Sequence, residues 1–565
     1  MTTRFVDGIQ ISPTEPSTSS ESTAEAFYCG FDSTPQLSSN ISTELNGQFF
    51  NKQKTKAKIN TKSIWKAKLY INLIAGAAIM LTILAGILLF VVIPHMGRSN
   101  SEQRLRRFPG NREHRYDWPP PSYSLMGRFK KAAVTCDHGI CSEIGRNILI
   151  AGGNAIDSAI ASLFCLGVTN PQSSGLGGGF IMTYYDRTKE KCFVLDARET
   201  APKASHKEMY GKDEWASKYG FRAIATPGEL AGYWRAFKEW GSGNVNWSDL
   251  IMPSVNLARK GVPISEFLAY VLNIKENHLK TLPSMKSWFN PKTNKVWQFG
   301  DIIKRPELAD TLERLANERN PVELFYRGEM AEEIINEMAD NAKFSNYTRW
   351  GNPLNGVLDD TEFYHWLIET QKFAYAKRTR LGDIHFVPQA KELAINMTQR
   401  EFAKMILKKV PPKAMFSTYY TDGNPINAQK EDHGTSHVSV LDADGNGVSA
   451  TSTVNRWFGA VVQSEKLGIV WNDEMDDFSS PGMPNGFGFA PSDANFIEPG
   501  KRPMSSMSPM VIFDRENGNL KFVIGASGGS KIISAMAKPI IRVLCFNETI
   551  KEAIDSPVLV GVKFN

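Results

Sequence analysis

DHGTSHVSVLDADGNGVSATSTV, residues 432–454, is the stretch of the chain that decides its fold. Within it, residues 437–441 and 447–454 have the composition of strands and flank an Asp- and Gly-rich run that starts at Asp442. Such a run between two strand-like segments signals a turn, so the stretch predicts a β-hairpin. A Gly434-Thr435 dipeptide stands directly before the first strand.

That dipeptide is a candidate source of a nucleophile. Cleavage between Gly434 and Thr435 would free an α-amino group that titrates at about pH 8 and can act as general base for the hydroxyl of the same residue. A histidine base is then not required. Taken alone, a Gly-Thr pair before a strand is ordinary, so the residues leave a purely structural role open.

Farther along the chain, Gly525-Ala-Ser-Gly-Gly529 lies between a predicted strand at 521–524 and a predicted helix that begins near Ile532. It matches G-x-S-x-G, but the histidine of that hydrolase fold follows its serine, and here the last histidine is His437. We therefore reject a serine nucleophile. What remains is a glycine pair at a helix N-terminus, whose N–H groups can stabilise a developing oxyanion.

Toward the N-terminus, the pattern from about Ser122 onward predicts a mixed α/β domain. Residues 142–150 and 155–166 are predicted helices, with Asn154 as the N-cap of the second. Residues 207–410 are rich in helix formers and show no repeat.

Two further motifs favour a structural interpretation. The run from Gly175 to Gly179 lacks the residues of a phosphate loop, and we interpret it as a glycine-rich turn. His433 and His437 have the spacing of helical metal ligands, but they lie where a loop enters a strand, and no metal is predicted.

Composition limits the function classes. The 565 residues suffice for a sizeable buried core. Sixty-five Lys and Arg against 59 Asp and Glu give a net charge of +6, which is small for this length and does not indicate a nucleic-acid partner. The six cysteines are too few for a disulfide scaffold and lack the paired spacing of a zinc module.

The first 125 residues differ from the rest. Residues 1–68 begin with a Ser- and Thr-rich part, predicted to be a disordered cytoplasmic tail, and end in a lysine-rich part. The apolar run 69–93 would extend about 37 Å as a helix, against roughly 30 Å of hydrocarbon, so it predicts one transmembrane helix. A buried soluble helix is the alternative, and residues 94–125 would form a stalk.

The orientation of that helix follows from two weak signals. Lysines before the span mildly favour a cytoplasmic N-terminus. Four glycosylation sequons after it favour an extracellular C-terminal part, at Asn246, Asn346, Asn396 and Asn547, although Asn40 also heads a sequon on the other side.

From about Ala132 to the C-terminus, the chain resembles the γ-glutamyltransferases, N-terminal-nucleophile enzymes that act on glutathione. The resemblance is carried by the strings Cys141-Ser-Glu-Ile-Gly, Asn170-Pro-Gln-Ser-Ser-Gly-Leu-Gly-Gly-Gly, Ala197-Arg-Glu-Thr-Ala-Pro, Gly434-Thr-Ser-His, Ala450-Thr-Ser-Thr-Val-Asn, Asn472-Asp-Glu-Met-Asp-Asp-Phe-Ser-Ser-Pro and Pro503-Met-Ser-Ser-Met.

The resemblance implies an α/β/β/α sandwich that cuts itself into a large chain, 126–434, and a small chain, 435–565. It implies that Thr435 is the nucleophile, supported by Thr453, and that Gly528 and Gly529 form the oxyanion hole. The implied contacts to the substrate are Arg198, Ser505 and Ser506 at the α-carboxylate and Asn455, Glu474 and Asp477 at the α-amino group. It further implies a disulfide between Cys141 and Cys165.

On the same basis, the expected substrates are glutathione and other γ-glutamyl compounds, with water, amino acids or dipeptides as acceptors and no cofactor. The expected location is the plasma membrane, with the catalytic domain outside the cell. A related amidase and a catalytically silent surface binding protein are the alternatives.

Four features depart from the pattern of the resemblance. The tail before the predicted span is longer than usual, Trp457 stands where many relatives have Tyr, and Asp473 stands where many have Asn. We expect the last two to alter the acceptor side or the pocket wall. The chain also ends at Asn565, sooner after Gly434 than the small subunits of the family, so we expect late strands of the sheet to be missing from this sequence.

Overall fold

A computed structural model of the chain describes residues 9–10, 126–211, 213, 215–341, 361–411, 413, 415, 417–420, 433–486, 490–546 and 548–556. The predicted tail, apart from residues 9–10, lies outside the described residues, as do the predicted span at 69–93, the stalk, Asn346 and Asn547. Within the described residues, no helix is long and apolar enough to cross a membrane.

A mixed sheet forms the centre of the part that the structure describes, with six strands in the order β1-β4-β3-β10-β9-β2. Its strands are β1 (Ile9–Gln10), β2 (Ala133–Cys136), β3 (Gly179–Asp186), β4 (Lys191–Ala197), β9 (Gly434–Leu441) and β10 (Gly447–Asn455). The predicted hairpin is confirmed, because β9 and β10 pair antiparallel. Asp442 closes its turn, since one carboxylate oxygen accepts hydrogen bonds from the backbone N–H groups of Asp444 at 3.0 Å and Asn446 at 2.9 Å.

Strands from before and after Gly434 share this sheet. β10 pairs with β3, and β9 pairs with β2, so the hairpin lies between strands that precede it in the chain. A break after Gly434 would therefore leave the hairpin hydrogen-bonded on both sides, and the two pieces would remain one folded unit.

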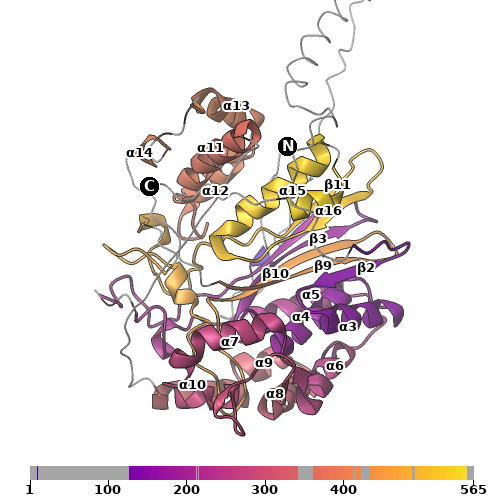
Figure 1. Cartoon of the computed structure of the whole chain (residues 1–565), viewed down its shortest axis with the longest axis vertical. Helices are drawn as coiled ribbons and strands as arrows, with labels where there is room; N and C mark the ends of the chain where they lie inside the picture. Colours follow the sequence, from indigo (N-terminus) through magenta and orange to yellow (C-terminus); the bar gives the residue numbers. More distant parts are fainter. Residues whose placement is uncertain are drawn as a thin grey trace, which may run out of the picture. The chain divides into compact units, whose positions relative to one another are not determined.

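Helices and a second small sheet cover the two faces of the central sheet (Figure 1). On one face lie α3 (Gly139–Ile150), α4 (Ala155–Thr169) and α5 (Glu229–Trp240), which share a hydrophobic core with the strands. On the other face lie β11 (Met510–Phe513) and β12 (Leu520–Ile524), and α15 (Ile532–Phe546) packs on their outer side. The layers run helix, sheet, sheet, helix, and the predicted α/β class is confirmed.

The two helices predicted in the N-terminal part are confirmed, with longer bounds than predicted. α3 begins at Gly139 because His138 caps it, its ring nitrogen accepting the N–H of Ile140 at 3.3 Å. α4 begins at Ala155 as expected, and Asn154 is its N-cap in a reciprocal capping box with Asp157.

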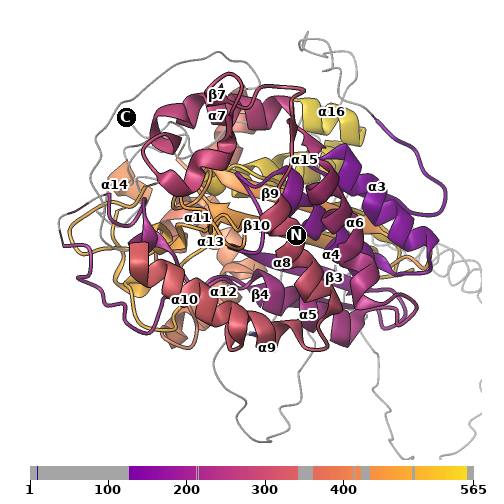
Figure 2. The same ribbon diagram turned by 90° about the horizontal axis from the view of Figure 1, so that it is seen from below.

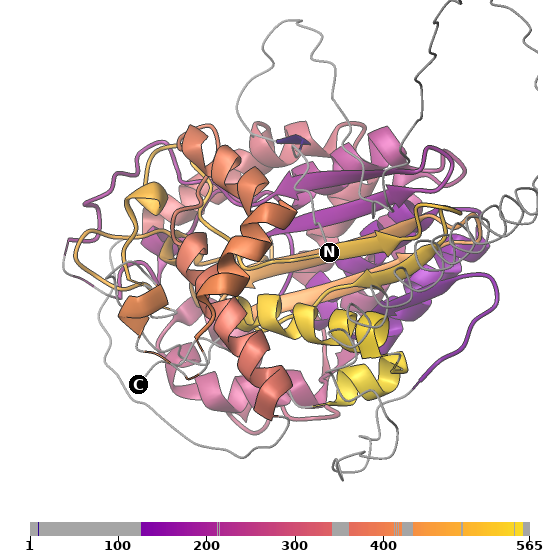
Figure 3. The ribbon, with the colours of Figure 1, turned by 90° about the horizontal axis from the view of Figure 1, so that it is seen from above.

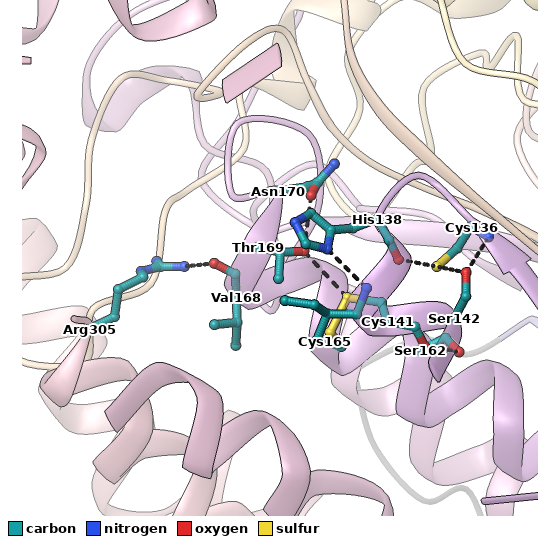
Figure 4. The surroundings of a disulfide bond; sticks show 11 residues. Cys136, His138, Cys141, Ser142, Ser162, Cys165, Val168, Thr169, Asn170 and Arg305 are labelled. Atoms are coloured by element: carbon teal, nitrogen blue, oxygen red, sulfur yellow. Dashed lines mark hydrogen bonds between the residues drawn. A yellow bond between two sulfur atoms is a disulfide. The ribbon is translucent and has the colours of Figure 1, made fainter. Parts of the chain in front are cut away.

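A disulfide between Cys141 and Cys165 joins α3 to α4, as the resemblance implies (Figure 4). The C-terminal end of α4 is held by Arg305, whose guanidinium donates to the carbonyl oxygens of Gly167 at 2.8 Å and Val168 at 3.3 Å. These carbonyls lie in the last turn, where a helix leaves its C=O groups without partners of its own. The cross-link and the cap together fix the point where the chain leaves α4 toward the candidate site.

The remaining elements surround these layers. Beneath the sheet lie α6 (Trp247–Lys260), α7 (Glu266–Leu279), α8 (Pro306–Asn317), α9 (Pro321–Tyr326) and α10 (Glu329–Asn341) (Figure 2). Above it, α11 (Thr361–Arg378), α12 (Pro388–Met397), α13 (Arg400–Lys409) and α14 (Ser417–Tyr420) form a helical group near α15 and α16 (Ile550–Asp555) (Figure 3). The short strands are β5 (Val262–Pro263), β6 (Phe289–Asn290), β7 (Lys295–Val296) and β8 (Ile302–Ile303).

Candidate active site

Thr435 lies at the start of β9, opposite Thr453 of β10, which in turn pairs with Gly179 of β3. The strand pairing on both sides holds the Thr435 backbone in place. Thr435 is 8% exposed and lines a pocket that also contains Arg198, Ser505 and Ser506.

Thr453 contacts the peptide group that joins Gly434 to Thr435. Its hydroxyl donates a hydrogen bond to the carbonyl oxygen of Gly434 at 2.5 Å and accepts one from the backbone N–H of Asn455 at 2.8 Å. The accepted bond fixes the hydroxyl, so its proton points at the Gly434 carbonyl. Thr453 therefore polarises the bond that self-cleavage would break.

Gly434 occupies a place that admits no side chain. A Cβ added there would lie 2.4 Å from the carbonyl oxygen of Arg456 and 2.7 Å from that of Gln172. Gln172 follows the end of α4, and its own carbonyl accepts the N–H of Phe458 at 3.1 Å. The close approach of these backbones requires glycine directly before Thr435.

After β12, Gly528 is the N-cap and Gly529 the first residue of the short helix η7 (Gly529–Lys531), which leads into α15. Both adopt positive φ, 120° and 58°, which disfavours other residues. Gly529 lines the same pocket as Thr435. The ring of His433 lies directly against Gly529, because a Cβ on that glycine would fall 2.4 Å from His433 Nδ1.

Arg198 follows the last residue of β4 and is almost fully buried. Its guanidinium forms ion pairs with Glu474 and Asp477, and lies 3.6 Å from a carboxylate oxygen of Glu199. Glu474 and Asp477 come from the short helix η5 (Glu474–Asp477), whereas Glu199 directly follows Arg198 in the chain. The cation and the acids expected at opposite ends of a substrate thus contact each other in this structure.

These contacts and the burial of the side chains shift the pKa values of Arg198, Glu199 and Glu474. Burial by itself would lower the pKa of the Arg198 guanidinium, but the surrounding carboxylates raise it above its ordinary value. Burial raises the pKa of Glu199 to about 7 and that of Glu474 well above its usual range, while Arg198 opposes both shifts. Three carboxylates thus share one buried guanidinium.

Side-chain amides hold the acidic turn in place. Asn472 accepts the N–H of Glu474 at 2.9 Å and donates to the carbonyl of Gly177 at 2.6 Å. Asn495 donates to the carbonyl of Asp477 at 2.7 Å and accepts the N–H of Met504 at 2.9 Å. The acidic turn and the serine segment 505–506 are thereby linked to each other.

The serines themselves face the pocket beside Arg198. Ser505 accepts the N–H of Met507 at 3.1 Å, and Ser506 accepts a hydrogen bond from the guanidinium of Arg378 at 2.8 Å. The structure therefore brings most of the predicted residues to one pocket, lined by Arg198, Thr435, Asn455, Asp477, Ser505, Ser506 and Gly529. Three further predicted residues adjoin this lining. Thr453 accepts a hydrogen bond from Asn455, Glu474 pairs with Arg198, and Gly528 directly precedes Gly529.

Sequence reasoning missed Arg378 and Asn495, which also line the pocket. Arg378 ends a helix that carries no recognisable motif, and Asn495 ends the short helix η6 (Asp493–Asn495), so no local signal marks either of them.

The two departures from the family pattern have structural roles away from the pocket. Asp473 forms a buried ion pair with Arg456, at 2.5 Å to the Nε atom, and burial raises the Asp473 pKa to about 7. Trp457 packs edge-to-face against Phe267 and Tyr270 of α7. Neither residue is among those that line the pocket, and their expected effect on the acceptor side stays a prediction.

His437 is a half-buried residue of β9. Its ring nitrogens lie 2.9 Å from the hydroxyl oxygens of Thr451 and Ser439, and burial lowers its pKa to about 3. Across the part of the chain that the structure describes, His, Cys, Asp and Glu form no group of three that could hold a metal ion. Of the sequon residues, Asn246 and Asn396 are exposed.

The family described as Gamma-glutamyltranspeptidase matches residues 141–356 and 346–562. Scoloptoxin SSD14 of Scolopendra dehaani is 36% identical over 487 residues, which cover 78% of this chain and 82% of that protein. Glutathione hydrolase proenzyme 2 of Schizosaccharomyces pombe is 36% identical over 473 residues, which cover 76% of each. Among solved structures, cephalosporin acylase from Bacillus halodurans has the same fold, with a TM-score of 0.64 at 22% identity over 79% of this chain and 86% of that one.

Proposed function

The chain belongs to the γ-glutamyltranspeptidase family, and from this premise we infer that it is a glutathione hydrolase and γ-glutamyltransferase whose nucleophile is Thr435. The observation that carries the assignment of residues is the pocket, in which Thr435 lies with a glycine of positive φ, a buried guanidinium, a carboxylate and two serine hydroxyls.

Maturation comes first. The Thr435 hydroxyl oxygen attacks the Gly434 carbonyl carbon, and the hydrogen bond from Thr453 stabilises the charge that develops on the carbonyl oxygen. The C–N bond breaks, the Thr435 nitrogen takes up the hydroxyl proton, and an ester joins the two residues. Water then hydrolyses the ester, which leaves a carboxylate on Gly434 and a free α-amino group on Thr435.

The mature site uses that amino group as its general base. It accepts the Thr435 hydroxyl proton as the oxygen attacks the γ-carbonyl of a glutamyl amide, and it returns the proton to the leaving amine. The N–H groups of Gly528 and Gly529 stabilise the oxyanion. Water resolves the resulting γ-glutamyl ester in hydrolysis, and an amino acid or dipeptide amine resolves it in transfer.

Substrate recognition uses both signs of charge. Arg198 and the hydroxyls of Ser505 and Ser506 bind the α-carboxylate of the substrate, because a guanidinium and two O–H groups can all donate hydrogen bonds to a carboxylate. Asn455, Glu474 and Asp477 bind the α-ammonium group of the substrate. The ion pairs between Arg198 and these acids keep both sides ordered and are partly exchanged for contacts with the zwitterionic head of the substrate.

The location is a separate part of the proposal. The apolar run 69–93 would anchor the chain in the plasma membrane, with residues 1–68 in the cytosol and the catalytic part outside the cell. Support comes from the disulfide, which forms in an oxidising compartment, and from the exposure of Asn246 and Asn396. Glycosidase treatment of the full chain from a eukaryotic host should lower its apparent mass, and Asn246→Gln together with Asn396→Gln should reduce that loss.

The direct test of the activity uses the full chain and a γ-glutamyl anilide. Release of the aniline, accelerated by a dipeptide acceptor, is expected from the parent and not from Thr435→Ala. A parent that matures to two chains yet releases no aniline, or a Thr435→Ala variant that retains activity, would contradict the proposal.

A further inference from the structure

α11 brings a second guanidinium to the pocket. Arg378 is the last residue of that helix, lines the pocket together with Arg198, and donates from Nη2 to the hydroxyl oxygen of Ser506 at 2.8 Å. It comes from a helix that has no part in the catalytic hairpin or in the acidic turn.

The chemistry of this contact fixes the direction of the Ser506 hydroxyl. A guanidinium only donates hydrogen bonds, so the oxygen of Ser506 accepts from Arg378 and its own proton remains to be donated. Ser506 lines the pocket, and a carboxylate only accepts. The contact with Arg378 thus prepares Ser506 to donate to an anion.

The charges that line the pocket also favour an anion beside the serines. Arg198 forms ion pairs with Glu474 and Asp477, which offset its positive charge. Arg378 adds a second positive charge to the lining, on the side of the serines. Burial lowers the pKa of the Arg378 guanidinium, an unfavourable desolvation that a bound anion relieves.

α11 is itself anchored to the segment that follows the glycine pair. The Tyr375 hydroxyl donates to the carbonyl oxygen of Ser530 at 2.5 Å, and the hydroxyl of Ser534 donates to the side-chain oxygen of Gln371 at 3.1 Å. These bonds set the position of the last turn of α11 relative to the oxyanion side of the pocket, and therefore the position of Arg378.

We propose that Arg378 is a positioning residue for the donor substrate: it holds the Ser506 hydroxyl in the orientation that donates to the α-carboxylate, and adds positive charge at that end of the pocket. The proposal rests on the proposed function, in which Ser505 and Ser506 face that carboxylate.

The test compares two donors that differ in one group, γ-glutamyl anilide and 4-aminobutyryl anilide, which lacks only the α-carboxylate. Arg378→Met should lower kcat/KM for the first about ten- to a hundredfold, mainly through KM, and leave the second unchanged within about threefold. Arg378→Lys, which keeps the charge and a donor, should recover part of the loss. Arg380→Met is the matched control, because Arg380 is exposed and does not line the pocket.

A double-mutant comparison tests whether Arg378 acts on the substrate through Ser506. In a Ser506→Ala background, Arg378→Met should cost clearly less than in the parent, since the two residues act as one unit. Equal losses on both donors, or an undiminished loss in the Ser506→Ala background, would show that Arg378 is merely structural and would overturn the proposal. A parent that cleaves the two donors equally well would overturn the proposed carboxylate contacts, and this inference with them. Where Arg378→Met fails to mature, Arg378→Lys and Arg378→Gln provide the same comparison.

Discussion

The hydroxyl of Thr453 donates a hydrogen bond to the carbonyl oxygen of Gly434, across the β9–β10 pair and next to the nucleophile Thr435. In the unbroken chain, this donor points at the atom on which negative charge develops during self-cleavage. The same hydroxyl is held by the N–H of Asn455, so it cannot turn away without losing a second bond. The pairing register of the hairpin therefore places a hydrogen-bond donor at the peptide bond that maturation would break.

Removing this hydroxyl should slow maturation. Thr453→Val keeps the shape of the side chain but removes the donor, and we expect self-cleavage to slow by about a hundredfold or more. Thr453→Ser, which keeps the hydroxyl, should mature at a rate near that of the parent. The cleaved fraction over time on a denaturing gel measures both, and equal rates for the Val variant and the parent would refute the role of Thr453.

Gly434→Ala should block maturation for a steric reason. The added Cβ would meet the carbonyl oxygens of Arg456 and Gln172, which belong to backbone and cannot move aside easily. Gly139→Ala is the control, because nothing lies within 4 Å of a Cβ at that position, in the first turn of α3. We expect a single uncleaved chain from the first variant and two chains from the second. Normal cleavage of Gly434→Ala would show that the packing around the bond is looser than described.

Arg198→Lys should weaken donor binding although it conserves charge. The guanidinium reaches Glu474 and Asp477 at once, and a single ammonium group cannot reproduce that geometry. The loss of one buried charge-assisted bond is worth about 1.5–3 kcal/mol, or roughly ten- to a hundredfold in kcat/KM on a γ-glutamyl anilide. Arg146→Lys, at an exposed ion pair with Glu143, should have no effect. Equal kcat/KM values for Arg198→Lys and the parent would contradict the assignment.

Glu229 should make stability fall as the pH rises. It is fully buried behind β10, where Ser452 donates to it at 2.9 Å, and burial raises its pKa to about 8. Below the pKa of the unfolded state both states are protonated, and between that value and about 8 only the unfolded state ionises, so the folded state is progressively disfavoured.

Glu229→Gln keeps the accepting oxygen and removes this titration. Its melting temperature should exceed that of the parent at pH 8, by an amount that corresponds to roughly 1–3 kcal/mol, and should approach that of the parent at pH 5. Calorimetry at the two pH values measures the difference. A parent that gains stability from pH 5 to pH 8 relative to Glu229→Gln would reverse the predicted sign.

Local patterns predicted the elements that local chemistry decides. The Asp- and Gly-rich run that starts at Asp442 predicted the hairpin correctly, because the Asp442 side chain itself closes the turn. Asn154 predicted the start of α4 correctly, because its side chain caps the first N–H groups of the helix. The Gly528-Gly529 pair was located for a similar reason, since positive φ restricts those positions almost to glycine.

Long-range contacts could not be predicted in this way. Arg378 meets Ser506 over 128 residues of sequence, and nothing near either residue signals the pairing. Asp473 was expected to alter the acceptor side or the pocket wall because it stands where many relatives have Asn, but its carboxylate pairs with Arg456. A buried carboxylate takes the nearest cation that the fold supplies, and only the tertiary structure shows which cation that is.

The central claim is that Thr435 becomes the N-terminal residue of a second chain and the nucleophile of the enzyme. Purification of the small chain from the parent, followed by N-terminal sequencing, tests it most directly. The account predicts a sequence that begins Thr-Ser-His-Val, and a single uncleaved chain for Thr435→Ala. A small chain that begins at any other residue, or the same two chains from Thr435→Ala, would contradict it.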